Sequence, residues 1–72
     1  MPRKQTFGRW LATTRDAAGK TRQQIADAIG VTYQSVANWE RDTNIPRDAF
    51  LGPLAKALRV RQSALALAAG KV

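Results

Sequence analysis

Residues 21–41 read TRQQIADAIGVTYQSVANWER, and this segment predicts two short helices joined by a glycine turn. Thr21 begins a Thr-x-x-Gln capping box, which satisfies free amides at the start of a helix. Gly30 ends that helix, because glycine adopts a positive φ at little cost. Thr32 can cap a second helix over residues 33–41.

The residues around this turn have the sizes that two closely packed helices require. Ile25 and Ile29 recur at helical spacing, and the small Ala26 lets the second helix approach. Val31 and Val36 are apolar and can fill the wedge between the helices. A turn with glycine between two short helices is typical of a helix-turn-helix motif. A plain helical hairpin would show the same spacing, so the pattern alone leaves both possibilities open.

The rest of the chain also shows helical periodicity and no alternating strand pattern. A helix is expected over about residues 5–18, and turn-forming residues predict a loop over 42–48. The helix after this loop is expected to begin near 51 or 52, because proline is tolerated in a first turn and Pro53 would then lie there. A last helix is expected over 63–69. The sequence therefore predicts an all-α fold, a compact bundle of five helices.

The composition excludes several classes of function. A length of 72 residues suits one domain, and the chain contains no Cys and no His. Ser-His-Asp and Cys-His catalytic centres and zinc sites built from Cys and His are therefore excluded. We expect one domain over residues 1–72, with no metal, no cofactor and no enzymatic activity.

A positive charge is the main compositional signal. The chain has 12 Lys and Arg against five Asp and Glu, a net charge of +7. Such a charge attracts a polyanion, with nucleic acid as the first candidate and an anionic membrane surface as the second. Residues 1–22 and 47–72 are basic, whereas 23–46 carry net negative charge. No apolar run long enough to span a membrane and no signal peptide occur, so we expect a cytoplasmic location.

The segment 21–41 resembles the helix-turn-helix of the phage repressor/Cro family, the XRE-like family. The likeness rests on Ala26, Gly30, Val31, Thr32, Val36, Trp39, Glu40 and Arg41. Ile45-Pro46 and residues 54–58 are similar to the family's later loop and fourth helix, so the likeness covers about residues 5–66. The resemblance implies a lambda-repressor-like bundle in which the second and third helices form the motif.

Three positions depart from the family's pattern. The family commonly has Gln directly after the Thr that begins its second helix, where the Gln meets a DNA phosphate. Here Arg22 takes that place and Gln23 follows; arginine can also reach phosphate, with more charge. The family's glycine after Trp-Glu-Arg is Asp42 here, and the glycine that closes its fourth helix is Arg59.

The resemblance implies that the third helix meets base edges in the major groove. Residues 32–38 carry no charge, which suits base readout, since the amide of Gln or Asn can bind adenine N6 and N7 together. A plain exposed polar helix face is the alternative reading. The expected base-reading residues are Tyr33, Gln34, Ser35, Ala37 and Asn38, with the Tyr33 ring or the Ala37 methyl as a contact for thymine.

Phosphate contacts are expected around this helix. The start of the second helix favours an anion, because its free N–H groups and dipole point outward. The expected phosphate-binding residues are Thr21, Arg22, Gln23, Thr32, Arg41, Thr43, Asn44 and Arg47, with a basic N-terminal arm over residues 1–4 that includes Arg3 and Lys4. For each single basic residue, a plain solvated role is the alternative.

Arg15 and Glu40 match positions that form an ion pair in the family. The resemblance implies a structural role for this pair, which would tie the first helix to the third and fix the tilt of the third helix.

The resemblance implies a sequence-specific regulator of transcription, Cro-like or a small repressor. Its expected partner is double-stranded DNA with a pseudo-palindromic operator, bound by a homodimer, without membrane or small-molecule ligand. Relatives often dimerise on DNA through surfaces that correspond to the region near Ile45, Phe50, Val60 and Leu65, and a monomer that pairs only on DNA is the alternative. The alternatives are an antitoxin-type or accessory DNA-binding module whose main partner is a protein, and a membrane-surface peptide; an enzyme fits least.

Overall fold

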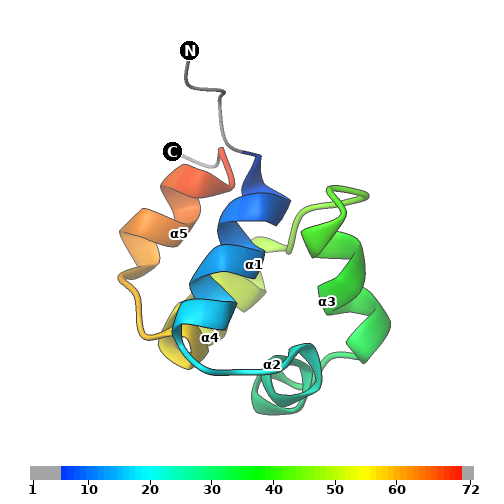
Figure 1. Ribbon diagram of the computed structural model, residues 1–72. Helices are drawn as coiled ribbons and strands as arrows, with labels where there is room; N and C mark the ends of the chain where they lie inside the picture. The colour runs from blue at the N-terminus through cyan, green and yellow to red at the C-terminus, as the bar shows by residue number, and fades with distance from the viewer. Residues whose placement is uncertain (1–5, 71–72) are drawn as a thin grey trace.

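The computed structural model describes residues 6–70, and all regular structure in this range is helical (Figure 1). The five helices are α1 (Phe7–Ala17), α2 (Arg22–Ile29), α3 (Tyr33–Glu40), α4 (Asp48–Leu58) and α5 (Gln62–Ala68). The predicted all-α, five-helix architecture is therefore confirmed. Within residues 6–70, no helix has both the length and the apolar character that crossing a membrane requires.

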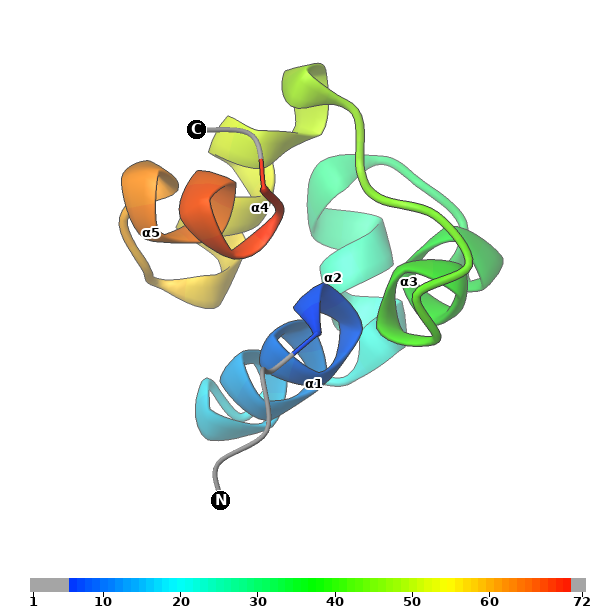
Figure 2. The same cartoon turned by 90° about the horizontal axis from the view of Figure 1, so that it is seen from above.

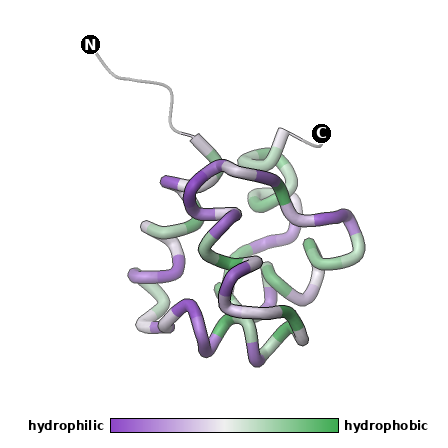
Figure 3. The backbone as a smooth tube through the Cα atoms, turned by 90° about the vertical axis from the view of Figure 1, so that its right-hand side faces the viewer, coloured by the Kyte–Doolittle hydropathy of each residue, from purple (hydrophilic) through white to green (hydrophobic). Residues whose placement is uncertain are grey.

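The helices pack in pairs around one apolar core. α3 packs against both α1 and α2, α2 also packs against α4, and α5 packs against α4 (Figures 1 and 2). Each helix contains both hydrophobic and hydrophilic residues, as expected for helices with one buried face (Figure 3). Every helix contributes to the core, and the largest fully buried side chains of the helices are Leu11, Ile25, Val36, Leu54 and Leu65.

Local capping signals define both ends of α2. The Thr21 side chain accepts a hydrogen bond from the Gln24 amide at 3.1 Å, and the Thr21 amide donates to Oε1 of Gln24 at 2.8 Å. Gly30 follows the helix with φ of 77°. Thr32 then caps α3 by accepting from the Ser35 amide at 3.1 Å. The predicted capping box, glycine turn and second cap are all confirmed.

The start of α4 differs from the prediction. The helix begins at Asp48, so Pro53 lies in its interior and the expected start near 51 or 52 was wrong. Proline disfavours a helical conformation of the residue before it, partly because its ring clashes with that residue's Cβ. Gly52 has no Cβ, so this clash is absent before Pro53. The hydrogen bond that Pro53 cannot donate would reach the Ala49 carbonyl, and both residues are exposed, so water can bind there.

Within residues 6–70, two residues other than glycine adopt a positive φ, and both stand at positions where the family that the sequence resembles has glycine. Arg59 ends α4 with φ of 60°, and Asp42 follows α3 with φ of 62°. The Asp42 carboxylate accepts a hydrogen bond from the Gly8 amide at 2.8 Å, so it caps α1 from the far end of α3. A Cβ at Gly8 would lie 2.4 Å from the Glu40 carbonyl oxygen. Gly8 and Asp42 together therefore allow α1 and α3 to meet closely.

α1 begins beside the end of α5. Thr6 and Trp10 line a shallow hollow together with Ala64, Leu67 and Ala68. Figure 1 shows the start of α1 and the end of α5 at the top, with α2 and the start of α3 at the bottom. The described chain therefore enters and leaves at one end of the molecule, opposite α2 and the start of α3.

Candidate nucleic-acid interface

The first turns of α3 present uncharged polar side chains at the surface. Tyr33 is 45% exposed, Gln34 is exposed, and Ser35 and Asn38 are half-buried. The Gln34 amide nitrogen donates to the amide oxygen of Asn38 at 3.0 Å, one helical turn away. The two amides are thus aligned along one edge of the helix, where their remaining donors and acceptors are available to a ligand.

Ala37 does not belong to this surface. It is 3% exposed, because α3 packs against both α1 and α2 and its buried face is therefore wide. Its methyl group is not available for a thymine, so the assignment of Ala37 to base reading was wrong. The remaining four predicted base-reading residues keep accessible surface.

A hollow of 280 Å³ lies on the α2 side of α3. It brings together several of the predicted phosphate-binding residues at the start of α2, where main-chain N–H groups are free of helical partners. Gln23 is exposed and donates to Oδ1 of Asp27 at 2.8 Å. The residues that line this hollow are Arg15, Thr21, Arg22, Gln23 and Tyr33.

A larger hollow of 560 Å³ lies on the other side of α3, against the segment that leads into α4. Thr32 and Ser35 border it with hydroxyl groups that lie 3.1 Å apart. Asn44 and Arg47 border it from the loop, so four of the predicted residues meet here. Its lining is Val31, Thr32, Ser35, Trp39, Asn44, Ile45, Arg47 and Phe50.

The other residues predicted to contact DNA or a second copy differ in their exposure. Arg41 and Thr43 are exposed after α3 and line neither hollow described here. The arm that includes Arg3 and Lys4 lies outside the described residues. Of the predicted dimer surface, Ile45 is 47% exposed, whereas Leu65 is fully buried and cannot contact a partner.

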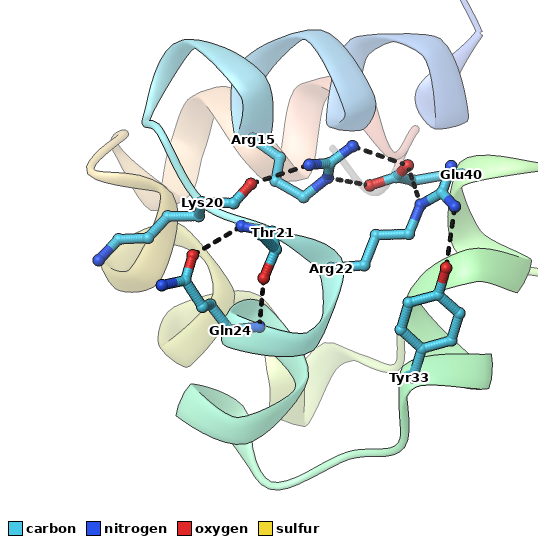
Figure 4. A network of polar contacts seen from close by, with 7 residues as sticks. All are labelled: Arg15, Lys20, Thr21, Arg22, Gln24, Tyr33 and Glu40. Carbon is cyan, nitrogen blue, oxygen red and sulfur yellow. Dashed lines mark hydrogen bonds and ion pairs between the residues drawn. The ribbon is translucent and has the colours of Figure 1, made fainter.

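Glu40 is the centre of a charged network at the junction of three helices (Figure 4). Nε of Arg15 lies 2.6 Å from Oε2 of Glu40, which forms the predicted ion pair. The Arg15 guanidinium also donates to the Lys20 carbonyl at 2.8 Å. The Glu40 side chain is 3% exposed and that of Arg15 is 16% exposed, so the pair is largely removed from water.

Arg22 joins the same network, a contact that the sequence did not predict. Its Nε donates to Oε1 of Glu40 at 2.9 Å, and its Nη1 donates to the Tyr33 hydroxyl at 3.2 Å. The hydrogen bond with Tyr33, and after it the contact with Glu40, raises the pKa of Arg22 above its ordinary value. The side chain is 41% exposed, so the guanidinium still faces solvent.

Asp42 and Gly8 are the other residues whose importance the sequence did not reveal. Asp42 was noted only as a departure from glycine, although Asp is among the few residues that tolerate a left-handed backbone. Gly8 gave a weaker signal, since a glycine within a helical pattern often marks a close approach. Neither signal identifies its partner 34 residues away.

No group of three or more His, Cys, Asp or Glu residues within residues 6–70 lies close enough to hold a metal ion.

Comparisons with known proteins identify the family. A helix-turn-helix family model (HTH_3) matches residues 11–65, most of the chain. The chain belongs to this XRE-type helix-turn-helix family. Its structure is similar to the crystal structure of the P22 c2 repressor protein in complex with synthetic operator 9T, with a TM-score of 0.79. The match covers 86% of this chain and 94% of the repressor chain at 24% sequence identity. None of the curated proteins compared matches the chain in sequence.

Proposed function

We propose that this protein is a sequence-specific regulator of transcription that reads operator bases in the major groove with α3. The observation that carries the proposal is the uncharged polar surface at the start of α3, placed between two hollows bordered by hydrogen-bond donors. In helix-turn-helix proteins the start of the second motif helix enters the major groove. The P22 c2 repressor, whose fold is similar, was crystallised with a synthetic operator.

Gln34 and Asn38 are the principal base contacts in this proposal. An amide can bind adenine N6 and N7 together, and such a contact discriminates against the wrong base by about 1–3 kcal/mol. The hydrogen bond between the two amides supports this assignment, because it orients both before DNA arrives. Ser35 adds a hydroxyl group, and the Tyr33 ring offers an apolar surface for a thymine methyl.

Donors on both sides of α3 contact the phosphates in this proposal. Helix N-termini and arginine side chains are the usual sources of such contacts, which fix the register of the protein on the duplex. The α2 side contributes Thr21, Arg22 and Gln23, and the other side contributes Thr32, Arg41, Thr43, Asn44 and Arg47.

The assembly that we propose is a homodimer on a pseudo-palindromic operator, with one domain over residues 1–72 in each copy. The exposed Ile45 supports it, because an apolar side chain beside the larger hollow can pack against a second copy. We propose a cytoplasmic location, where bacterial or phage DNA is accessible, and no cofactor, small-molecule ligand or enzymatic activity.

Selection from a random pool of duplexes tests the proposal. Duplexes retained by the protein should converge on one sequence, and the protein should bind it at least about 10³-fold more tightly than a scrambled duplex of the same composition. Affinity for both should fall steeply as salt concentration rises, because phosphate contacts release counterions. A pool that keeps a random sequence after repeated selection would contradict base reading and leave only charge-driven binding.

A further inference from the structure

The Arg22 guanidinium lies between the first and the last residue of α3. Tyr33 begins this helix and Glu40 ends it, and the guanidinium donates to both side chains, at 3.2 and 2.9 Å. Figure 4 shows the two side chains converging on Arg22 from the same face of α3. One residue at the start of α2 therefore holds both ends of the helix that we propose to read DNA.

The Glu40 end of this contact is fixed. Its side chain is 3% exposed and also accepts from Arg15, which is held by the Lys20 carbonyl. Because burial and Arg15 hold Glu40 in place, its hydrogen bond with Arg22 restrains the position of the Arg22 guanidinium. The planar fork of arginine can hold two partners in a set geometry, whereas lysine offers one compact charge.

The Tyr33 end of the contact has little other support. The residue is 45% exposed, so packing restrains its ring weakly. The hydroxyl group of Tyr33 accepts from Arg22, and this hydrogen bond restrains the ring against the α2 side of the motif. Loss of the bond would free the ring to adopt other rotamers on the surface that meets DNA.

We propose that Arg22 is a positioning residue that determines specificity, because its contact with the fixed Glu40 lets it set the orientation of the Tyr33 ring. This inference rests on the proposed function, since it requires that α3 reads bases. It adds to the phosphate contact proposed above for Arg22, because a phosphate contact alone would leave the discrimination between sequences unchanged.

The two roles predict different losses. Removal of a phosphate ligand weakens binding to every sequence equally and lowers the salt slope by about one unit. Removal of a positioning residue weakens binding to the selected duplex and changes binding to a scrambled duplex much less. The ratio of the two affinities, here the discrimination ratio, separates the roles.

The experiment measures the affinity of Arg22→Met, Tyr33→Phe and the double variant for the selected duplex and for its scrambled counterpart. Each single variant should lower the discrimination ratio about tenfold, the order expected for one lost base contact. The double variant should lose little more than Arg22→Met alone, because both changes remove the same hydrogen bond. Arg22→Lys should retain the parent's salt slope and still lose discrimination, because its single charge cannot bridge both partners.

Arg61→Met is the matched control. Arg61 carries the same positive charge as Arg22, but it lies at the start of α5 and lines neither hollow. The substitution should therefore leave the discrimination ratio unchanged. Thermal unfolding of each variant verifies that it is folded. If Arg22→Met is unfolded, the test relies on Tyr33→Phe, which keeps the ring, and on Arg22→Lys, which keeps the charge.

Two outcomes would overturn the inference, and they are distinguishable. If the parent discriminates but Arg22→Met weakens both duplexes equally and Tyr33→Phe keeps the parent's ratio, Arg22 is a phosphate ligand and only the inference fails. If the parent itself does not discriminate between the duplexes, the proposed function fails and the inference fails with it.

Discussion

The Glu40 carboxylate is the point at which α1, α2 and α3 are joined by charge. Arg15 approaches it from α1 and Arg22 from α2, and its side chain is almost completely buried. Removing a carboxylate from water carries a large desolvation cost, so such a network specifies an arrangement of helices more than it adds stability. Removal of one member, however, leaves the others without their partner.

Glu40→Ala is expected to lower the free energy of unfolding by about 3 kcal/mol, because the largely buried Arg15 then loses its counter-charge. Urea unfolding followed by tryptophan fluorescence measures the change. The double variant Arg15→Met with Glu40→Leu should recover much of the loss, since apolar side chains of similar volume fill the space. A Glu40→Ala protein that unfolds at the parent's urea concentration would refute the structural role of the pair.

Gly8 is the residue where two backbones meet most closely. Alanine is a better helix former than glycine, so Gly8→Ala would stabilise an isolated α1 by about 1 kcal/mol. In the folded protein the new Cβ would lie 2.4 Å from the Glu40 carbonyl oxygen, and backbone cannot easily give way. We therefore expect a net loss of about 2 kcal/mol in the free energy of unfolding, within the usual range for overpacking.

Thermal unfolding followed by circular dichroism tests this expectation. Thr13→Ala, on the exposed side of the same helix, is the control and should be at least as stable as the parent. Gly8→Ala with a melting temperature at or above the parent's would show that α1 and α3 separate at little cost.

At the level of the helices, the end of α4 carries avoidable strain. Arg59 adopts φ of 60°, a conformation that glycine reaches without the steric cost of a Cβ. Arg59→Gly should raise the free energy of unfolding by about 0.5–1 kcal/mol. Arg59→Ala is the matched control, because it removes the side chain but keeps the Cβ, and it should bring no gain. Equal stabilities of the two variants in urea would contradict the argument from backbone strain.

Asp42→Gly is expected to change the free energy of unfolding differently from Arg59→Gly, because the backbone angle alone does not decide stability. Asp42 also has a positive φ, but its carboxylate accepts from the Gly8 amide at the start of α1. A glycine there would relieve strain and lose this cap. The family's glycine is thus replaced here by a residue with a tertiary partner.

The exposed edge of α3 carries the base contacts that we propose. Gln34→Ala and Asn38→Ala should each weaken binding to the selected duplex by about 1–3 kcal/mol and change binding to scrambled DNA little. Since the two amides orient each other, the double variant should lose less than the sum of the single losses. Competition binding with both duplexes measures this. An unchanged discrimination ratio in both single variants would remove these residues from base recognition.

The sequence predicted those helix ends that local chemistry defines. Thr21, Gly30 and Thr32 act within a few residues of themselves, so capping rules place α2 and α3 almost to the residue. The start of α4 was missed because the general rule against interior proline does not account for a preceding glycine. Gly52 and Pro53 must be considered together to predict this helix.

The candidate site was predictable to a similar degree. Most of its residues lie close in sequence, on α3 and the segments beside it, so the motif brought them together without knowledge of the tertiary fold. Ala37 was misassigned because α3 is buried against two helices, which widens its buried face beyond one stripe. The contacts of Arg22 with Tyr33 and Glu40 depend on the crossing of α2 and α3, and no local pattern encodes them.

At the scale of the whole molecule, the net charge of +7 sets the attraction to DNA, and the position of each charge decides what it contributes. Arg47 borders the larger hollow beside α3. Arg47→Met should lower the slope of log affinity against log salt by about one unit and preserve the discrimination ratio. The measurement is a salt titration with the selected and scrambled duplexes. A slope equal to the parent's would place Arg47 away from phosphate.

The common end at which α1 begins and α5 finishes has a consequence for joining copies of this fold. A tether between the end of α5 in one copy and the start of α1 in the next would leave from the end of the molecule opposite the start of α3, so it would stay clear of the residues there that we propose to read bases (Figure 1). In such a tandem, binding of the first unit holds the second at a high effective concentration near the duplex. The length of the tether would then select the spacing between half-sites, without any change in the helices that contact them.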